Sequence, residues 1–154
     1  INELSLSNSI EILASYAFYQ NQIKSIEIPE NIIFISDSVF ENNKIEILTI
    51  PETITSIGNA SFKNNKIGLL YLNENLNYVG NNAFENNVIE SLITPNSLTN
   101  IGDHAFSNNN ISQLELSNVI AIGNYAFYQN FQRYQFEHCN LVYHSFFYMM
   151  DCYH

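Results

Sequence analysis

The sequence predicts a repeat solenoid, an α/β but mostly β fold in which one short unit is stacked in tandem. Apolar residues, glycines and asparagines each recur in a shared register, and phenylalanine marks that register most clearly. It recurs at steps of 22 residues, then 21, then 20: Phe18, Phe40, Phe62, Phe84, Phe106, Phe127 and Phe147. Core residues of an ordinary domain recur at about 2 or 3.6 positions, so a period this long is typical of stacked supersecondary units.

Seven units fill the chain, so we expect one domain over 1–154. The unit boundaries fall at 1–22, 23–44, 45–66, 67–88, 89–110, 111–130 and 131–154, the last unit being degenerate. The third unit shows the apolar pattern best: Ile45, Leu48, Ile50, Ile54, Ile57 and Phe62.

Each unit opens with a strand signal. Leu48-Thr49-Ile50 and its equivalents alternate inward and outward. Proline follows at Pro29, Pro51 and Pro95, where its missing N–H ends the ladder. Stacking these strands predicts a parallel sheet on one face, with right-handed connections.

The rest of the unit predicts a second short extended stretch, Ile54 to Ile57, and then a turn. A glycine recurs after that stretch at Gly58, Gly80, Gly102 and Gly123, as expected for a positive φ or a tight turn. The Ala-Phe segment that follows is too short for a free-standing helix. We expect it to form a single helical turn.

Asparagine, 25 of the 154 residues, forms two columns at the end of the units. One column contains Asn21, Asn43, Asn65, Asn87, Asn109 and Asn130; its neighbour contains Asn42, Asn64, Asn86 and Asn108. Sharp turns leave backbone groups without strand partners, and an amide can both donate to and accept from them. The columns therefore predict a structural asparagine ladder, with a polar recognition stripe as the alternative.

Composition restricts the function. The net charge of −10 argues against nucleic acid and anionic membranes as partners, because both require clustered Lys and Arg. The sequence contains no run of 18 or more apolar residues, so it predicts no transmembrane helix. Between Lys66 and Arg133 there is no Lys or Arg, whereas Glu74, Glu85, Glu90, Asp103 and Glu115 lie there. Both a basic partner and a solvated acidic exterior are consistent with that stretch.

The outward strand positions contain the candidate binding site. Most of them are polar, but Ile47, Leu69, Tyr71 and Ile93 are apolar and lie in adjacent units. With strands about 4.8 Å apart, the four should form one patch. Exposed apolar patches rimmed by polar residues often bind proteins. We predict that this patch binds a partner, with Glu27 and Glu115 on its rim; the alternative is an ordinary half-apolar surface.

The two ends of the stack differ. The last unit is bulkier and more aromatic, which predicts a cap over the final apolar layer. Its His138, Cys139, His144, Cys152 and His154 match no zinc spacing, so we predict no metal site. The first unit shows no cap at Ile1, Leu4 and Leu6, and the chain lacks an initial Met. We therefore expect it to be part of a longer chain.

The string IxxLxIPxxLxxIGxxAFxxN, seen at 45–65 and again at 89–109, resembles the BspA-like (Treponema-type) leucine-rich repeat. The resemblance covers 1–130 and, weakly, 131–147. It implies a leucine-rich-repeat superhelix in a family rich in cell-surface proteins that bind host or matrix proteins. It brings no catalytic residues. The family often has cysteine where Asn43, Asn65 and Asn87 stand here, a change that leaves the fold intact.

The sequence therefore predicts a protein-binding module on a cell surface or secreted, in adhesion or host contact. It contains no phosphate loop, catalytic constellation or paired carboxylates in a predictable cleft, so we expect neither an enzyme nor a bound cofactor. An intracellular scaffold or secreted effector using the same face is the alternative, as is a structural spacer with no ligand.

Overall fold

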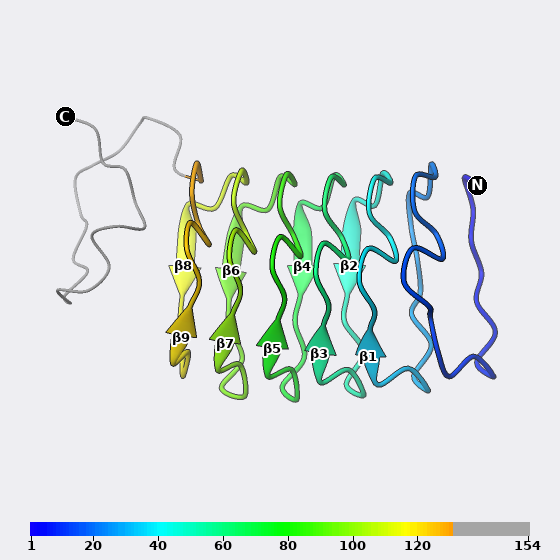
Figure 1. The fold of residues 1–154 in the computed structure, drawn as a ribbon, viewed down its shortest axis with the longest axis horizontal. Coiled ribbons are helices and arrows are strands. Elements are labelled where there is room, and N and C mark those ends of the chain that lie inside the picture. Colours follow the sequence, from blue (N-terminus) through cyan, green and yellow to red (C-terminus); the bar gives the residue numbers. More distant parts are fainter. Residues whose placement is uncertain (131–154) are drawn as a thin grey trace, which may run out of the picture.

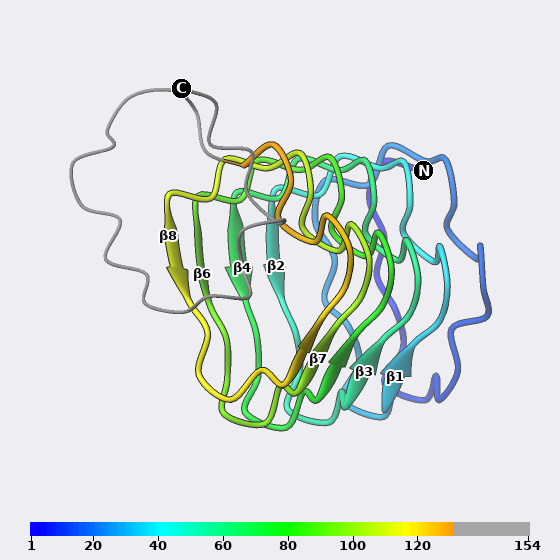
Figure 2. The same ribbon diagram turned by 60° about the vertical axis from the view of Figure 1, so that its left-hand side comes forward.

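The computed structural model describes residues 1–130, which form a parallel-strand solenoid (Figure 1). Within residues 1–130, each unit makes one coil, and the coils lie side by side along one long axis, from the amino end to β8 and β9 (Figure 2). The predicted mostly β repeat solenoid is confirmed.

Each coil from the third to the sixth contributes two short strands, and the second coil contributes one. The first strands of the coils are β2 (Ile47–Thr49), β4 (Leu69–Tyr71), β6 (Ser91–Ile93) and β8 (Gln113–Glu115). The second strands are β1 (Phe34–Ile35), β3 (Ser56–Ile57), β5 (Tyr78–Val79), β7 (Asn100–Ile101) and β9 (Ala121–Ile122). All pairings between them are parallel.

The longest sheet is built from the second stretch of each coil. It has five strands in the order β1-β3-β5-β7-β9, whereas the first stretches form two separate pairs, β2-β4 and β6-β8. The first four strands of the long sheet each direct one aliphatic side chain inward, at Ile35, Ile57, Val79 and Ile101, and each of these is at most 3% exposed. In β9 the equivalent Ile122 is only partly buried. The second stretch of each coil, predicted only as a short extended segment, therefore carries the continuous sheet.

The single helical turn expected around the Ala-Phe segment is wrong, because residues 1–130 contain no helix. This side of each coil consists of turns with two residues at positive φ, such as Ala60 at 53° and Asn64 at 56°. Alternate N–H groups of the turn donate to carbonyl groups of the next coil; Phe62, for example, donates to Ala83 at 2.9 Å. N–H groups that donate to the next coil are not available for the hydrogen bonds of a helical turn.

The recurring glycines also have a different role from the one expected. None of the chain's five glycines has a positive φ. A Cβ built on Gly80 would instead lie 2.7 Å from the Gly58 carbonyl carbon and 2.8 Å from the Asn59 nitrogen. Glycine is required here because neighbouring coils approach too closely for a side chain.

The phenylalanine column forms the centre of the core. Consecutive rings from Phe18 to Phe127 stack with centroids 5.2 to 5.6 Å apart and planes within 13° of parallel. The four central rings are fully buried: Phe40, Phe62, Phe84 and Phe106. Aliphatic residues from both strand columns pack around them, so the core is one long thin stack.

Candidate functional site

The outward side chains of β2, β4 and β6 form an exposed apolar surface. Their inward neighbours Leu48 and Leu92 are buried, which directs the alternate residues to solvent. The side chains of the residues that the sequence singled out are half-exposed or more: Ile47 55%, Leu69 52%, Tyr71 54% and Ile93 63%. We name these four residues the apolar face patch.

Strand register brings the members of the patch together. Ile47 lies directly opposite Leu69 in the β2-β4 pair, and Tyr71 follows two positions along β4 on the same side. β6 is the next strand to β4, although the two belong to separate sheets. Ile93 of β6 occupies the position equivalent to Tyr71, so the four side chains lie on three adjacent coils.

The two predicted rim carboxylates lie at opposite ends of this surface. Glu115 of β8 is the direct cross-strand neighbour of Ile93. Glu27 lies outside the assigned strands, beside a shallow groove of about 500 Å³ lined by Leu4, Leu6 and Ile26 among others. Glu115 is in direct register with the patch. Glu27, Thr49 and Tyr71 occupy equivalent positions in successive coils, so Thr49 lies between Glu27 and the patch.

Sequence reasoning missed a second group of exposed apolar side chains on the opposite side of the coils. Ile12, Ile33 and Phe34 are 69%, 58% and 42% exposed. A signal for them was present, because the inward residues Ile32 and Ile35 leave the two residues between them facing outward. They lie in the first two coils, away from the apolar face patch.

The asparagine column from Asn21 to Asn130, here called the inner column, has a structural role because its side chains hydrogen-bond the backbone. Each amide oxygen accepts from the backbone N–H that opens its own coil, as Asn65 does from Ile45 at 3.0 Å. From Asn43 onward, each amide nitrogen donates to two phenylalanine carbonyls; Asn65, for example, donates to Phe40 at 2.9 Å and to Phe62 at 3.1 Å. Five of these side chains are less than 9% exposed: Asn43, Asn65, Asn87, Asn109 and Asn130. The predicted ladder is thus present, and it bonds backbone groups.

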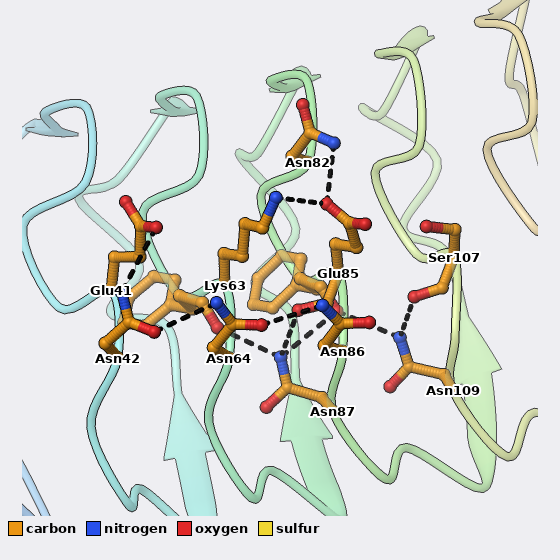
Figure 3. A network of polar contacts seen from close by, with 12 residues as sticks. Glu41, Asn42, Lys63, Asn64, Asn82, Glu85, Asn86, Asn87, Ser107 and Asn109 are labelled. Atoms are coloured by element: carbon orange, nitrogen blue, oxygen red, sulfur yellow. Dashed lines mark hydrogen bonds and ion pairs between the residues drawn. The ribbon is translucent and has the colours of Figure 1, made fainter.

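The outer column bonds side chain to side chain on the surface of the turn (Figure 3). Asn64 donates to Asn42 at 2.9 Å, and Asn86 donates to Asn64 at 2.7 Å. Above them, Lys63 forms an ion pair with Glu85 at 2.7 Å. These contacts occupy the polar side chains with one another, which supports a structural interpretation of both columns.

Two sequence-based predictions fall in residues 131–154, outside the described part of the chain: the aromatic cap, and the His and Cys residues considered as metal ligands. Within residues 1–130, no group of three or more His, Cys, Asp or Glu side chains is arranged to hold a metal ion. The same residues contain no helix long and apolar enough to cross a membrane.

The parallel coils, the stacked core and the exposed strand face define a repeat-solenoid protein. A model described as the BspA type leucine rich repeat region, in 6 copies, matches residues 1–112 and 70–152. The chain therefore belongs to the BspA-type leucine-rich repeat family. Repeats of this type suggest protein–protein interaction, are typically non-enzymatic, and often occur in cell-surface or secreted proteins. No curated protein and no solved structure matches the chain.

Proposed function

We propose that the chain is a non-catalytic protein-binding module of a cell-surface or secreted protein, and that it binds a host or matrix protein through the apolar face patch. The observation that carries the proposal is the contiguity of Ile47, Leu69, Tyr71 and Ile93, all exposed on three adjacent coils. Neither the core nor the asparagine ladder uses these four side chains.

Contact of this apolar surface with water is unfavourable, and a partner that covers it removes that cost. Burial of apolar area contributes about 25 cal/mol per Å², so four half-exposed side chains of this size can supply several kcal/mol to an interface. Tyrosine is favoured at the centre of interfaces because it buries a large rigid ring and still offers a hydroxyl group. Tyr71 lies beside Leu69 and next to Ile93, which places it in the middle of the patch.

The test measures binding of the full chain to a panel of purified extracellular-matrix proteins and, separately, to cytosolic extract. We expect matrix binding that the double variant Leu69→Ser/Tyr71→Ser abolishes without a change in thermal stability. The matched control is Ile33→Ser/Phe34→Ser, which removes exposed apolar side chains from the opposite side.

Three results would contradict the proposal. Unchanged affinity in the Leu69→Ser/Tyr71→Ser variant would exclude the patch as the binding surface. Patch-dependent binding only to cytosolic proteins would favour an intracellular scaffold or effector. Absence of binding to either source would favour a spacer.

A further inference from the structure

Gly68 differs from the other glycines because the fold does not require it. At Gly58, Gly80, Gly102 and Gly123, a built Cβ would lie less than 3.0 Å from backbone atoms of the neighbouring coil. At Gly68 the nearest atoms belong to Val88, at 3.9 Å, which is ordinary contact, and its φ is not positive. A side chain would therefore fit at this position, and its absence leaves the surface open.

The open position lies next to the apolar face patch and between two carboxylates. Gly68 directly precedes Leu69, and its N–H donates to the Glu46 carbonyl at 3.0 Å. The equivalent residues of the flanking coils are Glu46 and Glu90, both exposed. With coils about 4.8 Å apart, the backbones of these two glutamates are about 10 Å apart across Gly68. A long side chain from a partner has room to lie between them.

Acidic side chains on this side of the face outnumber basic ones in the later coils of residues 1–130. Lys24 belongs to the coil before that of Glu46 and Lys66 to the coil of Glu46 itself, but residues 67–130 contain no Lys or Arg. Glu90 and Glu115 are both exposed in that stretch, and Glu115 pairs in register with Ile93 of the patch. Within residues 1–130, Glu90 and Glu115 form no ion pair. Such carboxylates around an apolar surface favour a cationic ligand, because complementary charge speeds association and selects the partner.

We infer that the partner is a basic protein segment. It would pack an aliphatic or aromatic side chain on Leu69 and Tyr71 and place Lys or Arg side chains at Glu90 and Glu115, with the open position at Gly68 admitting one of them. Arg suits this role well, because its guanidinium group pairs with carboxylates in a bidentate manner and its flat face packs on tyrosine. The inference rests on the proposed function and specifies the chemistry of the partner.

The first test uses a random dodecapeptide library displayed on phage. The library is cleared on the Leu69→Ser/Tyr71→Ser variant and then selected on the full wild-type chain. We expect the selected peptides to combine a Leu, Ile, Phe, Tyr or Trp with adjacent Lys or Arg. Enrichment of neutral or acidic peptides overturns the inference and leaves the proposed function in place. Failure to select any peptide that depends on the patch also overturns it, and the matrix-binding test then decides on the proposed function separately.

The second test measures the affinity of a selected synthetic peptide as a function of salt. Glu90→Gln/Glu115→Gln is expected to weaken binding by about fivefold at low salt and to flatten the salt dependence, since two exposed ion pairs are lost. Glu30→Gln/Glu74→Gln is the matched control, because it removes the same charge from exposed residues outside the strands. An equal loss of affinity in both variants would show that only the net charge of the chain matters, and would overturn the assignment to Glu90 and Glu115.

Discussion

The buried asparagine at the end of each coil takes the place of backbone partners at a corner where no strand can supply them. The Phe62 carbonyl accepts from Asn65 of its own coil and from Asn87 of the next, at 3.1 and 2.9 Å. The Ile45 N–H donates to the Asn65 amide oxygen. One side chain thus closes its own coil and links it to a neighbour, which an aliphatic residue cannot do.

Replacement of Asn65 by Ala should destabilise the protein by about 3 kcal/mol, because the buried Ile45 N–H loses its partner and two carbonyls each lose a donor. Urea unfolding followed by circular dichroism measures the change. Asn77→Ala is the control: Asn77 is exposed and its side chain makes no hydrogen bond within residues 1–130, so its loss should cost less than about 0.5 kcal/mol. Equal effects of the two substitutions would refute this role of the inner column.

The role of the inner asparagines was predictable from the sequence, because the amide recurs where a sharp turn needs both a donor and an acceptor. The positive φ at Ala60 and Tyr16 was not predictable. Neither residue type favours that region, and the conformation is imposed by hydrogen bonds to the next coil.

At the scale of the structural element, the coil is shaped by its distance from the neighbouring coils. At Gly58, Gly80, Gly102 and Gly123, adjacent coils lie so close that a built Cβ would come within 3.0 Å of backbone atoms of the neighbouring coil. The turns that follow donate their N–H groups to the next coil, as Ala60 does to Asn81 at 2.8 Å. The sequence marked both segments as special but did not reveal the partner, because that partner lies one coil further along the chain.

Two glycine substitutions test whether glycine is needed for the close approach of neighbouring coils or for backbone flexibility. Gly80→Ala should cost about 2 kcal/mol, because the new methyl group meets the Gly58 and Asn59 backbone, which cannot rotate away. Gly68→Ala should be neutral or stabilise the fold by about 0.5 kcal/mol, since it meets nothing closer than 3.9 Å and restricts the unfolded chain. Differential scanning calorimetry measures both. A similar loss at the two positions would show that the glycines are selected for flexibility.

At the scale of the whole molecule, residues 1–130 form a one-dimensional stack in which the strands of each coil contact those of the adjacent coils. Phe84 lies between two rings, 5.5 Å from Phe62 and 5.2 Å from Phe106. Phe18 stacks on Phe40 alone among the described rings and is only half-buried. In such a stack, the cost of losing one layer depends on how many neighbours it supports.

Phe84→Ala should therefore destabilise the chain by about 4 kcal/mol, whereas Phe18→Ala should cost less than about 2 kcal/mol. Urea unfolding gives the two free energies, and hydrogen exchange with mass spectrometry locates the region that opens. In the Phe84 variant we expect faster exchange in the coils on both sides, and in the Phe18 variant only in the first two. The same loss at both positions would contradict the stacking model.

The sequence by itself determined the period, the inward residues, the inner asparagines and the outward position of Ile47, Leu69, Tyr71 and Ile93. A strict repeat gives equivalent residues equivalent neighbours, so one well-marked unit predicts the others. Only the tertiary structure decided that the second stretch carries the continuous sheet, that the Ala-Phe segment is a turn, and that Gly68 alone among the glycines is open. These features depend on the distance between successive coils, which residues adjacent in sequence do not determine.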